Sequence, residues 1–446
     1  MLRLLKYFRG FIDDVRNPKD LQASLRFLFL LALIFGLIPF QVCSTREGPQ
    51  RLRATFLGYL NVGLRFLFYS ISFVYSMAKD QSLLWYFFHS PISRLTDSMQ
   101  KFNGMFGIVL ELLICLFERR HFLRFLLKYE LVEWKFFGVG VAFVHKVSAR
   151  KMNRNMALMV FSTVGYIAFS NLFILKRNSI YASFSACIAF YSPQILVCGV
   201  VVMFMTTTFK LREYLRALNK VLKNLLHQWD KRSIGNIARK QRSFQCLDSF
   251  SIYTVVTRNP SEIIQESMDI HQLICEAAAT ANKYFTYQLL TIISIAFLII
   301  VFDAYYVLET LLGKSQRESK FKTVEFVTFF SCQMILYLIA IISIVEGSNR
   351  AISKSEKTGS IVHSLLNKAK NPEVKEKLQQ FSLQLLHSKI NFTAAGLFNI
   401  DRTLYFTISG ALTTYLIILL QFTSSAPGKE APSICIVNNI TETIDS

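Results

Sequence analysis

Long apolar runs recur along this chain, and stretches rich in Lys and Arg separate them. Each run is close in length to the roughly 20 apolar residues that a helix needs to cross about 30 Å of hydrocarbon. The pattern therefore predicts membrane-spanning helices. The eight apolar segments are 25–43, 55–79, 99–117, 156–176, 184–208, 285–309, 323–346 and 403–422.

The composition agrees with a polytopic membrane protein. Hydrophobic residues make up 52% of the 446 positions, and 41 residues are Phe, which is too apolar for a soluble protein of this size. The net charge of +21 would suit a nucleic-acid partner, but the basic residues lie between apolar helices. Such residues mark the cytoplasmic side of a membrane protein, so we expect no nucleic-acid partner. No cleavable signal peptide precedes the first apolar run, and the first segments are expected to direct targeting.

The charges between the apolar segments orient the helices. Segment 118–155 holds nine Lys and Arg against three acids, and 347–402 holds nine against four. Segment 209–284 opens with the basic amphipathic stretch "KLREYLRALNKVLKNLL". The positive-inside rule predicts that all three are cytoplasmic. The C-terminal tail then lies outside, where the sequon at Asn439 is predicted to carry a glycan.

The basic N-terminus is also predicted to be cytoplasmic, so one early apolar segment does not cross. Residues 44–54 are more basic than 80–98. Segment 25–43, which Pro39 interrupts, is therefore predicted to be interfacial or re-entrant. The alternative is eight partial spans with a short hairpin at the start. We expect an all-α protein with seven transmembrane helices, oriented opposite to the G-protein-coupled receptors.

This topology divides the chain into consecutive regions. They are the cytoplasmic N-terminus 1–54 with segment 25–43; 55–208, holding four transmembrane helices and cytoplasmic loop 118–155; cytoplasmic segment 209–284; 285–346, holding the fifth and sixth helices; cytoplasmic segment 347–402; the last helix, 403–422; and the extracellular tail 423–446.

Two cytoplasmic stretches are amphipathic. In 209–284, leucines recur every three to four residues, and 361–392 shows a similar pattern. Solvated helices with apolar stripes need partners. The partner is a neighbouring subunit or the other stretch of the same chain, and the sequence allows both. The leucines are Leu211, Leu215, Leu218, Leu222 and Leu225.

The last apolar segment carries a polar stripe. Thr407, Thr414 and Gln421 recur every seven residues, a spacing that keeps them on one helix face, and Gly410 shares it. Two interpretations compete: a packing seam between helices, or the lining of a pore with Gln421 near its extracellular end. The opposite, apolar face holds Ile408, Leu412, Leu416 and Leu419.

Acids and tyrosines gather at the outer end of 285–309. They suit a pocket for hydroxyl-rich or amine-bearing ligands, or else an aromatic belt with acids that face water. The residues there are Asp303, Tyr305, Tyr306 and Glu309. Further candidates on other spans are Tyr166, Asn171, Tyr181, Tyr191, Gln333 and Tyr337.

The sequence shows no constellation typical of an enzyme. It has no Ser/His/Asp arrangement, no HExxH and no Walker loop. The eight cysteines show no zinc spacing, and Cys115, Cys187, Cys198 and Cys332 lie inside apolar segments. We expect no enzymatic activity, no metal site and no cofactor.

The last apolar segment also carries a recognisable motif. "TTYLIILLQF" resembles the signature of insect gustatory receptors, Thr-Tyr, five apolar residues and Gln-Phe, here Thr414, Tyr415, Gln421 and Phe422. The preceding "AAGLFNIDRTLYFTISGA" and the inverted seven-span layout are similar to this family too. The resemblance is most specific over 270–422, and it is closer to the gustatory receptor twenty-eight group than to the sugar receptors.

This resemblance implies a chemosensory, ligand-gated, non-selective cation channel in the plasma membrane of sensory neurons. The last helix would line the pore of a tetramer, homomeric or shared with other gustatory receptor subunits, with Gln421 and Phe422 at the gate. Tyr415, off the stripe, would pack against an adjacent helix. The cytoplasmic extensions would form an anchor between subunits, and each subunit would bind a small-molecule tastant in the outer half of its bundle.

The resemblance leaves the stimulus open. We expect aversive or broadly tuned taste responses. Gating by light or warmth in non-gustatory neurons is an alternative, and a metabotropic seven-helix receptor is another.

Overall fold

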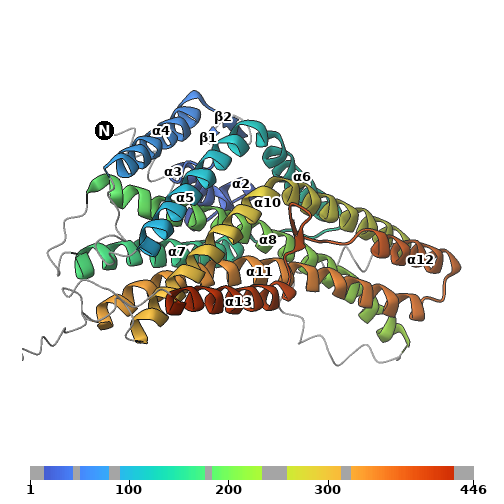
Figure 1. Ribbon diagram of the computed structural model, residues 1–446. Coiled ribbons are helices and arrows are strands. Elements are labelled where there is room, and N and C mark those ends of the chain that lie inside the picture. Colours follow the sequence, from blue (N-terminus) through green and yellow to red (C-terminus); the bar gives the residue numbers. More distant parts are fainter. Residues whose placement is uncertain are drawn as a thin grey trace, which may run out of the picture.

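The computed structural model describes residues 15–43, 51–79, 91–175, 183–233, 259–312 and 323–425, and it is built almost entirely of helices (Figure 1). The helices are α2 (Leu21–Ser24), α3 (Arg26–Ile34), α4 (Phe56–Ala78), α5 (Pro91–Phe117), α6 (Arg119–Gly138), α7 (His145–Phe169), the π-helix η2 (Ser170–Leu175), α8 (Phe184–Ser233), α10 (Pro260–Leu311), α11 (Thr323–Lys368), α12 (Pro372–His387) and α13 (Thr403–Ser425). Two antiparallel hairpins join β1 (Phe40–Cys43) to β2 (Arg51–Ala54) and β3 (Thr393–Ala394) to β4 (Phe398–Asn399).

The predicted class, an all-α polytopic membrane protein, is confirmed. Six described helices are long and apolar enough to cross a membrane, and the number reaches seven if the bent pair α5 and α6 counts as one span. The six are α4, α7 continuing into η2, α8, α10, α11 and α13. Their apolar parts match six of the eight segments read from the sequence.

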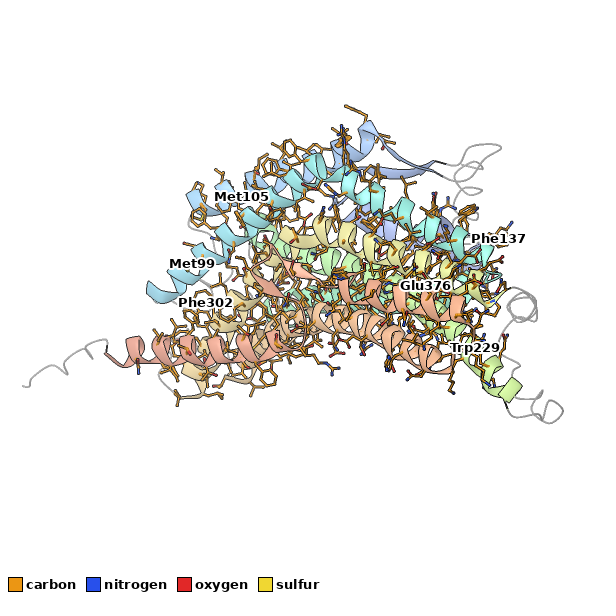
Figure 2. All side chains as sticks on the ribbon, turned by 90° about the vertical axis from the view of Figure 1, so that its right-hand side faces the viewer. Met99, Met105, Phe137, Trp229, Phe302 and Glu376 are labelled. Atoms are coloured by element: carbon orange, nitrogen blue, oxygen red, sulfur yellow. The ribbon has the colours of Figure 1, made fainter. Side chains whose placement is uncertain are left out.

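Three helices are much longer than a membrane span. Helices α8, α10 and α11 have 50, 52 and 46 residues, or about 70–80 Å each at 1.5 Å per residue. They run beside one another along the long axis of the molecule (Figure 1). In Figure 2, Met99 and Phe302 lie toward one end of this axis and Trp229 and Glu376 toward the other.

The apolar stripes of the extensions are buried within the chain. All five leucines of the α8 stripe are buried, and α11 and α12 contribute Val362, Leu365, Leu378 and Phe381 to the same core. A buried hydrogen bond from Thr358 Oγ1 to Asn219 Oδ1, 2.7 Å long, also joins α11 to α8. Packing inside one chain therefore accounts for the α8 stripe and for part of the stripe in 361–392.

Segment 118–155 is predicted as a loop, but it contains helix α6 and the start of α7. The buried residues of α6 recur every three or four positions, among them Phe122, Phe125, Tyr129 and Phe136, and they pack against α10. This spacing is readable from the sequence, but the basic residues of the exposed face obscure it.

Segment 25–43 forms a short helix and the first strand of a hairpin. Helix α3 covers nine residues, or about 14 Å, which is shorter than the hydrocarbon layer. How this segment meets the membrane stays a prediction.

Candidate functional site

Helix α13 lies at the edge of the bundle and exposes most of its surface (Figure 1). Only 6% of its spanning window is buried. Ile408 and Leu412 pack on the main core, and Leu416 and Leu419 pack on a second, aromatic cluster. This is the apolar face read from the sequence, and it attaches α13 to the bundle.

The polar stripe points away from that attachment. Thr407, Gly410, Thr414 and Gln421 are all exposed. The Thr407 and Thr414 hydroxyls donate to the carbonyls of Thr403 and Gly410, at 3.4 and 3.0 Å. Their donors are thus used inside the helix, and the hydroxyl oxygens remain as acceptors on the exposed face. Phe422 belongs to α13, but its side chain lies outside the described part of the structure.

Tyr415 packs on a neighbouring helix. Its ring meets that of Phe297 of α10 edge-on, with the ring centroids 5.9 Å apart.

An ion-pair cluster holds the start of α13. Glu346 of α11 accepts from Arg402 at 3.0 Å and from Arg350 at 3.3 Å. Asp401 caps the helix by accepting from the Thr403 N–H at 2.8 Å. This link could not be read from the sequence because Glu346 and Arg402 lie 56 positions apart, at the ends of two different apolar runs.

Several predicted pocket residues come together between α7, α8 and α11. Tyr166 donates its hydroxyl hydrogen to Gln333 Oε1 at 3.1 Å, and the hydroxyls of Tyr191 and Ser170 lie 2.6 Å apart. The rings of Tyr166 and Tyr191 meet edge-on at 6.4 Å. Asn171 lies near this group, and its amide donates to the carbonyl of Ile167 at 2.8 Å.

Helix α10 adds the acidic and aromatic residues to this region. Asp303 is 4% exposed, and Tyr305 and Tyr306 are each 1% exposed, so these three do not face water as the aromatic-belt alternative requires. The Tyr306 ring contacts that of Phe330, with the ring centroids 5.3 Å apart. Glu309, nearer the end of α10, is half-buried.

Three polar atoms in this region are buried with no hydrogen-bond partner among the described residues. They are Asp303 Oδ2, Tyr337 Oη and Gln333 Nε2. Each such atom costs about 1–3 kcal/mol unless water or a ligand satisfies it. We therefore regard the region as the candidate ligand site. The sequence did not predict three of its residues, Ser170, Phe329 and Phe330. Tyr181 was also predicted here and lies outside the described residues.

A cleft of about 230 Å³ lies between α4, α5 and α8. Arg65 and Glu111 are the charged residues that line it, and each forms a hydrogen bond with another residue. Arg65 Nε donates to Asn61 at 3.2 Å, and Glu111 accepts from Gln288 at 3.1 Å. Among the described residues, no group of three or more His, Cys, Asp or Glu side chains is placed to hold a metal ion.

The family described as 7tm chemosensory receptor matches residues 25–425. Gustatory receptor 28b of Drosophila melanogaster is 54% identical over 427 residues, which cover 95% of this chain and 90% of that protein. Gustatory receptor 28a of the same species is 33% identical over 416 residues, which cover 90% and 91%.

Solved structures show the same fold. The insect olfactory receptor OR5 from Machilis hrabei matches with a TM-score of 0.60 and 13% identity, over 90% of this chain and 98% of that one. Its complex with eugenol matches with a TM-score of 0.56 and 12% identity, over 92% and 100%.

Proposed function

Because this chain belongs to the 7tm chemosensory receptor family, as a gustatory receptor, we propose that it is a subunit of a ligand-gated, non-selective cation channel. It acts in the plasma membrane of sensory neurons and opens when a small-molecule tastant binds. The observation that carries the channel assignment is the exposed polar face of α13.

That face needs a polar environment inside the membrane. A stripe whose exposed Thr407 and Thr414 faced lipid would leave their hydroxyl acceptor oxygens in hydrocarbon, which is unfavourable. Copies of the chain around a common axis would instead place the stripe on a water-filled path. Four residues of the apolar face of α13, Ile408, Leu412, Leu416 and Leu419, already pack within the chain, so the opposite, polar face is the one we propose for this role.

The predicted cytoplasmic parts of α8, α10, α11 and α12 support such an assembly. Their inner faces are buried within the chain, whereas Leu383 and Leu386 on α12 and Leu397 in the β3–β4 hairpin are exposed. Exposed leucines on helices that carry an apolar stripe are available for contact with another protein surface. We propose that they meet a neighbouring subunit and anchor a tetramer.

The direct test is a ligand panel applied to cells that express this chain, with whole-cell current as the readout. We expect a cation current for at least one ligand class, and none in cells without the chain. A current evoked by light or warming alone, with no response to any ligand, would favour the alternative stimulus.

The orientation separates a channel from a metabotropic receptor. We expect the tail to be extracellular and Asn439 to carry a glycan, so that glycosidase treatment increases the gel mobility of the wild-type protein but not of Asn439→Gln. A tail that is accessible to antibody only after permeabilisation, without a glycan, would contradict the proposed topology.

The pocket proposal centres on Asp303. A buried carboxylate beside tyrosine rings suits an amine-bearing ligand, because the carboxylate pairs with the ammonium group and the rings with its apolar part. We expect Asp303→Asn to raise the half-maximal concentration of amine ligands by about 10-fold or more, the loss of one charge-assisted hydrogen bond. Asp269→Asn, the same substitution at an exposed position near the other end of α10, is the matched control. An unchanged response in Asp303→Asn would exclude this carboxylate from ligand binding.

A further inference from the structure

A second cleft, of about 210 Å³, lies between α7, α8 and α11. One side is apolar, with Met156, Met205, Phe209 and Ile342. The other side carries charge, and its arginines are Arg212 and Arg350. The cleft is thus amphipathic and distinct from the candidate ligand site.

The cleft lies at a single membrane boundary. The predicted span of α7 begins at Met156, that of α8 ends at Thr208, and that of α11 ends at Glu346. All three residues line the cleft. Three spans delimited independently therefore meet there, on the side predicted to be cytoplasmic.

Cations concentrate on α8 and α11 beside this cleft. Removal from water lowers the pKa of Lys354, and the nearby charges of Lys357, Arg216, Arg212 and Lys223 lower it further. Like charges placed this close repel one another, and an anion shared among them would relieve that repulsion.

The described acids near these cations leave most of them without an ion pair, although the charge of Glu213 acts on Arg212. Glu346 in the cleft is already bonded to Arg350 and Arg402. Among the described residues, no carboxylate lies within ion-pair distance of Arg212, Arg216 or Lys354. The Arg212 guanidinium instead lies over the Phe209 ring, 5.1 Å from its centroid, at the junction of the charged and apolar sides.

We propose that this cleft binds an anionic phospholipid of the cytoplasmic leaflet, with the headgroup phosphates at Arg212, Arg350 and Lys354. Guanidinium groups match phosphate oxygens in geometry as well as in charge. An acyl chain lies along the apolar side, next to residues that α7 and α11 expose toward the membrane, such as Phe161 and Ile339. The proposal rests on the proposed orientation but not on channel activity.

The site has a route to the last helix. Arg350 shares Glu346 with Arg402, which immediately precedes α13. A phosphate bound to Arg350 competes with Glu346 for that guanidinium and leaves Glu346 to Arg402 alone. Lipid binding thus changes the contact that holds the start of α13.

The test measures binding of a fluorescent short-chain phosphatidylinositol 4,5-bisphosphate to the purified full-length protein in detergent. We expect Arg212→Gln/Lys354→Gln to weaken binding by about 10- to 30-fold, because each Lys or Arg near an anionic lipid multiplies affinity several-fold. The matched control, Lys370→Gln/Lys375→Gln, removes the same charge from exposed positions around the start of α12 and should change affinity less than about two-fold. Size-exclusion profiles confirm that both variants fold.

Equal losses in the two double variants, or no loss in either, would overturn the site. Inositol 1,4,5-trisphosphate and inorganic phosphate separate a lipid from a soluble anion. We expect both to compete at least about 10-fold more weakly than the lipid, since neither buries an acyl chain on the apolar side. Competition at the affinity of the lipid would overturn the lipid assignment. Binding requires no current, so these outcomes do not depend on the proposed channel function.

Discussion

Replacing Gln421 by Arg is expected to abolish the ligand-evoked cation current while the protein still reaches the cell surface. Gln421 is exposed at the predicted extracellular end of the α13 stripe, so a larger side chain there does not disturb the packed apolar face. In an assembly around an axis, one fixed positive charge from each subunit repels cations where little water screens it. We expect a reduction of more than about 10-fold, because each 1.4 kcal/mol added to a permeation barrier is a factor of ten in rate.

Two adjacent threonines offer a matched control for the same assignment. Thr413 and Thr414 are both exposed, and both donate to a carbonyl four residues earlier, at 2.9 and 3.0 Å. They differ by about 100° around the helix, so only Thr414 lies on the stripe. We expect a charged thiol reagent to block current through Thr414→Cys and to leave Thr413→Cys much less affected. Equal effects at the two positions, or unchanged permeation after substitutions at Thr407, Thr414 and Gln421, would contradict a pore-lining face. A structure of the assembled protein would show directly whether copies of Gln421 surround one axis.

The second large effect is expected in the cytoplasmic bundle. Phe381 of α12 is 0% exposed, and its ring meets that of His271 of α10 at 5.8 Å. Phe381→Ala removes a large buried ring between two helices that converge from distant parts of the sequence. The expected loss is about 3–5 kcal/mol in the free energy of unfolding, seen as a lower melting temperature of the detergent-purified protein.

A conservative substitution distinguishes packing from a specific role of the ring. Phe381→Leu keeps much of the apolar volume, and we expect it to cost less than half as much as Phe381→Ala. A melting temperature that is unchanged in Phe381→Ala would show that α12 is not packed as described.

The candidate ligand site could be read only partly from sequence. Asp303, Tyr305 and Tyr306 stand out because acids and tyrosines are costly inside apolar runs, and the sequence predicted them at the outer end of one span. It left open whether they face the interior or the aromatic belt. Which of them are buried depends on how α10 rotates against α7 and α11, and that rotation comes from many individually weak contacts, such as those of Phe329 and Phe330.

The sequence by itself determined the class of the protein, the approximate limits of its apolar helices and the two faces of α13. Each of these features depends only on the residues of one segment, through their periodicity and the free-energy cost of polar groups in hydrocarbon. The tertiary structure decided what each face meets. It buried the leucines of α8 inside the chain, turned segment 118–155 into the packed helix α6, and left the polar stripe of α13 exposed. It also brought together the cations of α8 and α11, more than 130 positions apart, because side chains from separate helices become neighbours only when the helices pack.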